Sequence, residues 1–408
     1  MKRIINQRFN IGIVLLLLTT SITNLIAYIT NKSMYQLSDI LLVVSLICLI
    51  DFKSLKKLKF YISKLQGVLY IYILILLIFG ISSGYSFNSG LGSIIYIIFS
   101  LFVMMALFTN EKWNYNSDFP RILFYISGLL CILATFVISD NLTNIYTGIN
   151  SIYSKEGLLI VNRLTLSTFS LMALITCFCY TSKNKYEFVL KLIFAIFAIL
   201  LIMIVSRRGS TIELIIGAIV LIIHNLNLKN KKIMKKDIIK FFFMVLIIAV
   251  TIIALLHNED FKKRINIFVN SINKAVITLI NDDNKNGRDV AASIRYNNRN
   301  ATISEFNSFN ITEIFLGKGY MSRNQIDFPL LQIFYDCGIL MGIIYFILSI
   351  VYPLKFVISK PKNDMDKIMI YFAIITICNS FFTGNPYGIN CYMYLIIVLF
   401  YYFQKKMI

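Results

Sequence analysis

The chain has 408 residues, of which 58% are hydrophobic and 15% charged, and its mean hydropathy is +0.73. A soluble domain needs a largely polar surface, so this composition excludes an ordinary soluble protein. The net charge of +20 would suggest nucleic acid for a soluble protein. Beside membrane spans, however, basic residues set orientation, so we expect no nucleic-acid partner. The seven Cys have no metal-ligand spacing, and we expect no metal site and no cofactor.

Apolar runs of about bilayer length recur along the whole chain, which predicts an all-α, polytopic membrane helix bundle. About 12 transmembrane helices are expected, at residues 10–30, 36–51, 66–83, 91–109, 120–139, 163–181, 188–206, 210–226, 241–256, 329–350, 368–383 and 391–403. No internal repeat and no Gly/Ser-rich linker divides the sequence. Residues 1–408 are therefore expected to form a single integral membrane domain.

Basic residues are distributed unequally between the two sets of alternating connections. The segments on the side of the N-terminus contain 25 Lys and Arg, whereas the short connections on the other side contain five. Segments rich in Lys and Arg stay in the cytoplasm. We therefore expect a multi-pass membrane protein with both termini cytoplasmic and its longest connection outside.

That longest connection, residues 257–327, separates the ninth and tenth predicted spans and is the only long segment too polar for a membrane. It contains ten Lys or Arg and eight Asp or Glu. Apolar residues at three- and four-residue steps predict an amphipathic helix over 261–280, and a second helix is expected from about Arg288 to Phe306. A turn at Gly317–Gly319 then leads back into the membrane at Pro329. This large extracytoplasmic loop is the segment expected to meet a substrate.

Two adjacent arginines, Arg207 and Arg208, lie in an external connection of only a few residues, and Glu213 lies one turn into the next span. Guanidinium groups match phosphate oxygens bidentately, so the pair is a candidate anion-binding site. The alternative is that the arginines only reach the membrane interface, or that an ion pair with Glu213 fixes the packing of the helices. Glu213 is accordingly expected to be a structural polar residue.

Three more arginines, Arg288, Arg295 and Arg299, are spaced by seven and four residues and would share one face of the second loop helix. Basic residues outside the cell do not set topology, which makes these arginines candidates for binding phosphate or a polyanionic glycan. The alternative is a stripe of side chains that is merely solvated.

Three carboxylates lie in or beside the second half of the loop. Asp327, at the mouth of the tenth span, can act as a general base or can cap the helix that begins near Pro329. Glu305, on the second loop helix, is the reserve candidate for the base. Asp336 lies deeper in the same predicted span, where we expect a structural hydrogen-bonding role. The two histidines, His224 and His257, are predicted on opposite sides of the membrane.

The order of these segments resembles the O-antigen polymerase/ligase family, which includes Wzy-type repeat-unit polymerases and O-antigen ligases. The matching parts are Ser206-Arg207-Arg208-Gly209-Ser210 at the start of a span, the large loop, its end at Phe315-Leu316-Gly317-Lys318-Gly319-Tyr320, Asp327-Phe328-Pro329-Leu330-Leu331-Gln332, and Asp336-Cys337-Gly338-Ile339-Leu340-Met341-Gly342. Ligases of this family usually have a histidine where Asp327 stands, so the resemblance favours a polymerase.

The resemblance implies a GT-C-like, metal-independent glycosyltransferase of the bacterial cytoplasmic membrane. Such an enzyme joins oligosaccharide repeat units carried on undecaprenyl pyrophosphate, at the outer face, for capsule, O-antigen or exopolysaccharide biosynthesis. It implies a flippase and a chain-length regulator as candidate partners. The arginines would bind the pyrophosphate, and Asp327 or Glu305 would deprotonate or orient a sugar hydroxyl.

Three alternatives stay open at this point. They are an O-antigen-ligase-type glycan transferase, a flippase for lipid-linked oligosaccharides or another transporter, and a nonenzymatic membrane protein whose loop recruits partners.

Overall fold

The computed structural model describes residues 2–30, 35–82, 87–110, 118–139, 151–153, 159–205, 208–226, 290–320, 328–382, 386–387 and 389–406, with a few single positions between 259 and 326. This described part is helical apart from one short antiparallel hairpin, β1 (Ser151–Tyr153) and β2 (Leu159–Asn162). The hairpin was not expected from the sequence, in which only a loop is predicted at these residues.

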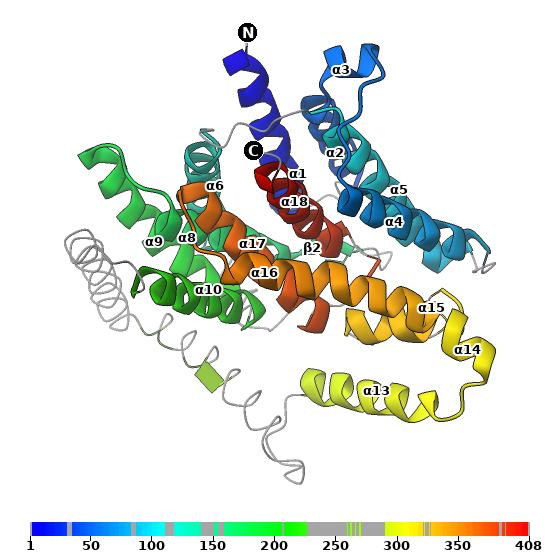
Figure 1. Cartoon of the computed structure of the whole chain (residues 1–408). Coiled ribbons are helices and arrows are strands. Elements are labelled where there is room, and N and C mark those ends of the chain that lie inside the picture. Colours follow the sequence, from blue (N-terminus) through cyan, green and yellow to red (C-terminus); the bar gives the residue numbers. More distant parts are fainter. Residues whose placement is uncertain are drawn as a thin grey trace.

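Long apolar helices make up the first half of the chain (Figure 1). They are α1 (Lys2–Thr30), α2 (Tyr35–Leu49), α4 (Lys64–Ser82), α5 (Phe87–Phe108), α6 (Phe119–Ser139), α8 (Ser167–Cys179), α9 (Lys185–Val205) and α10 (Arg208–Leu226). Two short helical segments join them, α3 (Phe52–Lys56) and the 3₁₀ turn Arg163–Leu166.

The second half contains the polar connection and the last apolar helices. Its elements are α13 (Val290–Phe306), α14 (Ile311–Leu316), α15 (Pro329–Phe346), a π-helical turn (Ile347–Val351), α16 (Tyr352–Ile358), α17 (Asp364–Phe382) and α18 (Ile389–Lys406). α13 confirms the second predicted loop helix, although it begins after Arg288. The ninth predicted span, 241–256, and nearly all of the predicted helix 261–280 lie outside the described residues.

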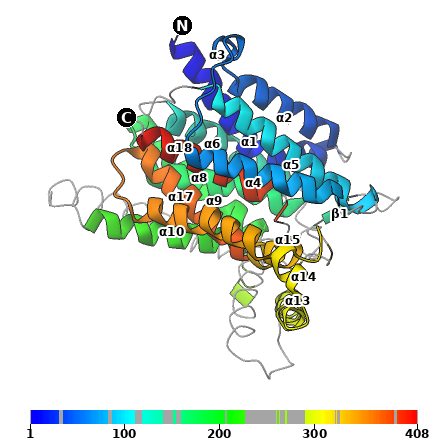
Figure 2. The ribbon, with the colours of Figure 1, turned by 45° about the vertical axis from the view of Figure 1, so that its right-hand side comes forward.

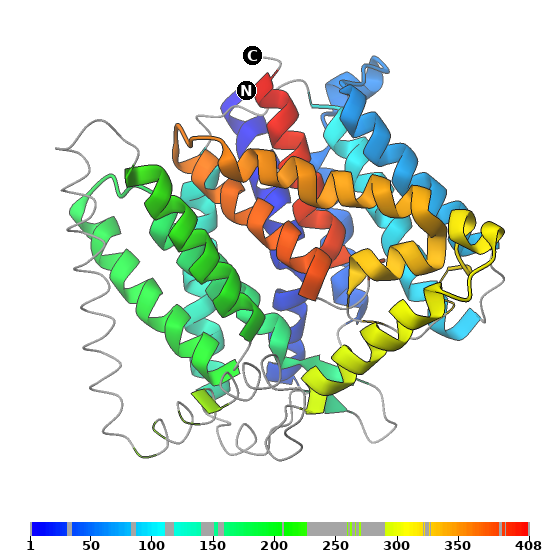
Figure 3. The ribbon, with the colours of Figure 1, turned by 60° about the horizontal axis from the view of Figure 1, so that its bottom comes forward.

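Successive apolar helices run in alternating directions, so the bundle has two ends. At the termini end, the start of α1 lies beside the end of α18, where the rings of Phe9 and Phe400 are 6.1 Å apart. At the opposite end, which we call the loop end, the Ser21 hydroxyl of α1 donates to the backbone oxygen of Thr165, just before α8. α13 and α14 lie at the loop end, away from both termini (Figures 1 and 3).

Five helical segments of the described part are long and apolar enough to cross a membrane. They are Gln7–Thr30, Lys64–Ile81, Phe119–Ile138, Lys185–Val205 and Pro329–Ile358. The outer faces of the described helices are also apolar, because isoleucines such as Ile71 of α4 and Ile215 and Ile219 of α10 are more than half exposed. A water-facing surface of this kind would be costly, whereas lipid tails cover it without penalty. The structure is therefore that of a membrane protein, in agreement with the expected contact with a lipid bilayer.

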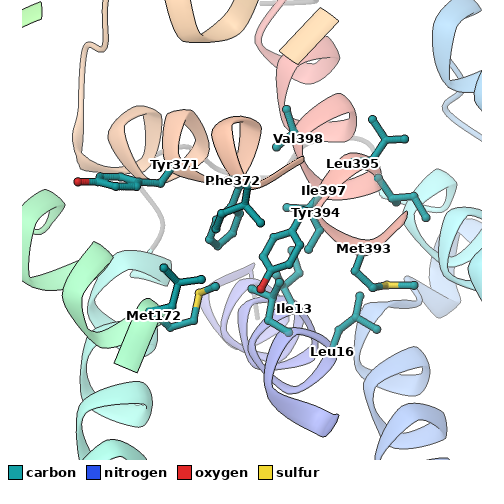
Figure 4. Close-up of a cluster of buried hydrophobic side chains, with 14 of the residues drawn as sticks. Ile13, Leu16, Met172, Tyr371, Phe372, Met393, Tyr394, Leu395, Ile397 and Val398 are labelled. Carbon is teal, nitrogen blue, oxygen red and sulfur yellow. The ribbon is translucent and has the colours of Figure 1, made fainter. Parts of the chain in front are cut away.

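The interior is one continuous apolar cluster, and α1, α17 and α18 all contribute buried side chains to it. Figure 4 shows Phe372 of α17 and Tyr394 of α18, whose rings are 5.4 Å apart, converging above Ile13 and Leu16 of α1. α8 is buried along almost its whole length, with the other helices around it (Figure 2). This packing fixes the positions of the helix ends, including those at the loop end that carry polar residues.

A buried carboxylate ties three helices together at the termini end. Glu187 of α9 is 1% exposed and accepts hydrogen bonds from Arg121 Nε (3.0 Å), the Tyr125 hydroxyl (3.1 Å) and the Tyr180 hydroxyl (2.9 Å). The Lys183 backbone N–H adds a fourth donor at 2.7 Å. A buried charge is tolerated when donors surround it in this way. The cluster joins α6 and α9 to the end of α8.

Candidate functional site

Helix α15 is broken at Gly338, and this break organises the loop end. Gly338 has φ 79° and ψ 179°, a backbone conformation that is essentially restricted to glycine. The segment Pro329–Cys337, which we call the half-helix, folds back on the following helix (Figure 3). The ring of Phe334 consequently lies directly against Gly342. The predicted span 329–350 is helical as expected, but it is interrupted at Gly338. Asp336 lies near the turn between the two pieces, and not deep in a continuous helix.

The glycine turn at the end of the polar connection binds the break directly. The backbone N–H of Lys318 donates to the carbonyl oxygen of Tyr335, and that of Gly319 to the carbonyl oxygen of Asp336, both at 3.0 Å. A broken helix leaves carbonyl groups without intrahelical partners, and in a membrane these groups must be satisfied by protein. The turn supplies both donors, so the polar connection is part of the membrane domain at this point.

The short helix α14 leads directly into this turn. The sequence contains a clear signal for the start of α14. The side chain of Asn310 accepts from the Glu313 backbone N–H (2.8 Å), and the Glu313 carboxylate accepts from the Asn310 backbone N–H (2.9 Å). This reciprocal pair is a capping box, for which an Asn followed three residues later by a Glu is suited. α14 ends at Gly317, whose φ of 77° starts the turn. The chain is thereby aimed at the half-helix.

The Asp336 carboxylate is fully buried and receives three hydrogen bonds from three parts of the chain. The Ser322 hydroxyl donates at 3.2 Å, the Gln332 amide at 2.9 Å and the Tyr387 hydroxyl at 2.8 Å. Burial raises the pKa of the Tyr387 phenol well above its usual value, so this group stays protonated and donates. Asp336 thus links the polar connection, the half-helix and the segment between α17 and α18. Its hydrogen-bonding capacity is used within the protein, which suits a structural role.

A second carboxylate, Glu305, lies beside the same break on the solvent side. The hydroxyl of Tyr335 donates to Glu305 at 2.6 Å, which holds α13 against the half-helix. The ammonium group of Lys318 lies over the ring of Phe309 at 4.8 Å and over that of Tyr335 at 5.8 Å. Glu305 is partly exposed, in contrast to Asp336, so it is the carboxylate of this pair that a substrate can reach.

A third carboxylate, Glu213, lines a cavity between the helices at the loop end. The cavity has a volume of about 100 Å³, and Glu213 is 4% exposed. Around it lie polar groups from five other segments, namely Thr20 and Ser21 of α1, Thr165 of the 3₁₀ turn, Thr168 of α8, Asn379 of α17 and Tyr394 of α18. The remaining wall is formed by Leu16, Leu17, Leu42, Leu171, Ile375 and Met393. A carboxylate next to hydroxyl and amide groups in an apolar bundle marks a site for a small polar group.

The expected arginine and aspartate site residues are only partly described. Arg207, Arg288 and Asp327 lie outside the described residues, and Arg208 and Arg295 are placed by their backbone alone, at the start of α10 and within α13. Arg299, one turn after Arg295, is exposed on α13.

The N-cap of α15 is Phe328, and its side chain makes no cap hydrogen bond.

The structure brings Glu305 and Asp336 to the same break, whereas Glu213 lies in the separate cavity. Sequence reasoning missed Ser322, Gln332 and Tyr387 as partners of Asp336, and it missed the cavity altogether. A glycine directly after Asp336-Cys337 was the available signal for the break, because a glycine inside an apolar run can mark a kink.

Within the described residues, no group of three or more His, Cys, Asp or Glu side chains is placed to hold a metal ion. Comparison of the chain with protein-family models, with curated proteins and with solved structures finds no match. The fold and this site define a helical membrane protein with a polar site at one end of its bundle.

Proposed function

We propose that the chain is a polymerase that joins undecaprenyl-pyrophosphate-linked oligosaccharide repeat units at the outer face of the bacterial cytoplasmic membrane. In this proposal twelve helices cross the membrane in a GT-C-like arrangement, both termini are cytoplasmic, and the loop end faces outward. The product is a capsule, O-antigen or exopolysaccharide chain. The reaction transfers the growing chain from its lipid pyrophosphate to a sugar hydroxyl of an incoming unit, without a metal ion.

The observation that carries the proposal is the docking of the glycine turn on the broken helix. The turn at Gly317–Gly319 and the segment around Gly338 are two of the parts of the chain that resemble the O-antigen polymerase/ligase family, and they contact each other through backbone hydrogen bonds. In this proposal the contact lies at the boundary between the apolar bundle and water. A lipid-linked sugar has its reactive bond at the same boundary, because its carrier is in the membrane and its sugar is in solvent.

The candidate catalytic groups then take the following roles. Arg207, Arg208 and the arginines of α13 bind the departing pyrophosphate, whose charge is stabilised by guanidinium donors. Asp327 accepts the proton of the acceptor hydroxyl, and Glu305 is the reserve candidate because it is partly exposed beside the break. Asp336 positions the surface through its hydrogen bonds to three segments.

The broken helix also favours a second candidate, a transporter of lipid-linked oligosaccharides. Interrupted helices commonly form the substrate sites of secondary transporters, where the freed backbone groups bind the cargo. In this structure the carbonyl groups of Tyr335 and Asp336 are already bonded to Lys318 and Gly319. They are therefore occupied by the protein itself, which makes the transporter the less favoured candidate.

Deletion of the gene, followed by mass spectrometry of the lipid-linked oligosaccharides, tests the proposal. A polymerase mutant accumulates single repeat units on undecaprenyl pyrophosphate and makes no polymer. These units lie in the outer leaflet, so an impermeant oxidant such as periodate modifies them in whole cells. A complementing wild-type copy restores the polymer.

Two results would exclude the proposal. Single units that are protected from the oxidant indicate a block in transport to the outer leaflet, which is the transporter outcome. Unchanged polymer in the deletion strain removes the polymerase assignment altogether.

A further inference from the structure

The cavity at Glu213 is lined by polar residues that have no role in the reaction proposed above. It lies one to two turns below the loop end, since Glu213 is the sixth residue of α10 and Asn379 is four positions from the end of α17. With a rise of about 1.5 Å per residue, Glu213 lies about 8 Å below the start of its helix. The cavity therefore lies in the part of the bundle that is near the loop end.

The wall of the cavity is divided between polar and apolar groups. One carboxylate, one amide, one phenol and four aliphatic hydroxyl groups belong to residues that line this space, and they come from six separate segments of the chain. Polar groups in a membrane bundle are costly unless they bind one another or a ligand. Their gathering from helices far apart in the sequence at one cavity is the arrangement of a binding site. A single interhelical polar contact would need only two of them.

The size of the cavity limits what it can hold. About 100 Å³ is space for several water molecules, because one water needs roughly 10–15 Å³ measured in this way. It is much smaller than a pocket for a drug-sized ligand, which has about 300–1,000 Å³. An oligosaccharide repeat unit does not fit, whereas one hydroxyl-bearing edge of a sugar ring does.

We propose that this cavity is the subsite for the acceptor sugar, in which Glu213 and Asn379 hydrogen-bond the hydroxyl groups of a single uncharged sugar ring. The Glu213 carboxylate accepts from sugar hydroxyls, the Asn379 amide can both donate and accept, and the Tyr394 ring offers an apolar surface to the sugar. The remainder of the repeat unit stays at the loop end. This inference rests on the proposed polymerase function and assigns Glu213 a part in recognition in addition to helix packing.

The carboxylate explains why a hydroxylated ligand would be selected. A site built to hydrogen-bond a hydroxyl group discriminates strongly against a ligand that lacks it, because the buried polar groups are then left without a partner. A negatively charged sugar would be repelled by Glu213, so the sugar that enters is expected to be neutral.

The test uses the full-length protein in lipid nanodiscs and single lipid-linked repeat units purified from the deletion strain. The rate of chain extension is measured against the concentration of single units. Glu213→Gln removes the charged acceptor and Thr168→Leu fills the cavity with an apolar side chain. Both should raise the KM for the single unit about 10- to 100-fold, the effect of losing a hydrogen bond to a charged group, with a smaller change in kcat. Glu213→Asp should restore part of the loss.

Two controls keep folding and chemistry apart. Glu259→Gln makes the same chemical change at an exposed position, and Ile219→Leu is a lipid-facing change on the same helix, α10. Both should leave KM unchanged. If Glu213→Gln fails to accumulate, Thr168→Leu alone decides, since it removes no charge.

Three outcomes would overturn the inference. KM values within threefold of wild type for Thr168→Leu would show that no sugar enters the cavity. A fall in kcat alone in both variants would indicate a role in packing. A requirement for sodium ions that is lost in Glu213→Gln at unchanged KM would identify a cation site. The polymerase assignment fails separately, because without it the deletion strain yields no single units that the impermeant oxidant can modify.

Discussion

Replacement of Gly338 by alanine should destabilise the protein more than replacement of Gly319, a glycine of the nearby turn at which an added Cβ meets no other atom. A Cβ at position 338 would overlap the backbone carbonyl of Phe315, at a separation well inside 3.0 Å. The positive φ alone costs about 1–3 kcal/mol for a residue other than glycine. The overlap forces the turn away from the break, and the two hydrogen bonds from Lys318 and Gly319 contribute about 0.5–1.5 kcal/mol each. The expected total is about 2–6 kcal/mol.

Gly319→Ala is the matched control for this change. Gly319 also has a positive φ, 106°, but nothing lies within 4 Å of a Cβ built there. The control therefore measures the backbone strain without the overlap, about 1–3 kcal/mol. The assay is reversible unfolding in mixed micelles, followed by tryptophan fluorescence or circular dichroism. Equal destabilisation by the two substitutions would show that the turn does not pack against the break as described, and the reasoning would be refuted.

Four further expectations concern the topology and the proposed site. A cysteine introduced at Asn286 should react with an impermeant thiol reagent in whole cells, and protection there would invert the orientation. Replacement of both Arg207 and Arg208 by lysine should lower the rate of polymerisation roughly 100- to 1,000-fold, because an ammonium group cannot replace a bidentate guanidinium. Normal polymer from the variant with alanine at both positions would show that these arginines do not bind the pyrophosphate. Asp327→Asn should abolish polymer while the protein accumulates normally. A wild-type amount of polymer from this variant would show that Asp327 is not the base and would leave Glu305 of α13 as the candidate. Tyr387→Phe should destabilise the protein by about 1–3 kcal/mol because a buried carboxylate loses a donor, and unchanged unfolding would show that this hydrogen bond is not formed.

The positions of the apolar helices could be predicted from hydropathy, because each is a run of apolar residues bounded by polar ones. Every predicted span within the described residues is helical, and α13 lies where the second loop helix was expected. The break at Gly338 could not be predicted in the same way. The apolar run continues from Phe328 to Ile358 without a charged interruption other than Asp336 and Lys355, and a glycine is also tolerated inside a regular helix. Only the contact with the turn at residues 317–319 makes the reversal favourable, and that contact is tertiary.

The candidate site shows the same division between local and tertiary information. Glu213 and Asp336 were noticed because a carboxylate in an apolar run is unusual. Their surroundings could not be inferred, since the cavity around Glu213 is built from α1, α8, α10, α17 and α18, and Tyr387 approaches Asp336 from 51 residues away. Periodicity shows which residues share a helix face, but it does not show which helices meet.

The contact between the turn and the break has a consequence for exchanging parts between related proteins. Judged by sequence polarity, the large loop ends at residue 327, and a chimaera would be joined there. In the structure, the segment from Asn310 to Ser322 supplies the donors for two backbone carbonyl groups and for one carboxylate of the following segment. A foreign loop grafted at residue 327 would separate these partners and leave buried acceptors in an apolar environment. The natural joint lies before Asn310, at the end of α13, so a transplanted specificity loop should retain α14 and the glycine turn of the recipient.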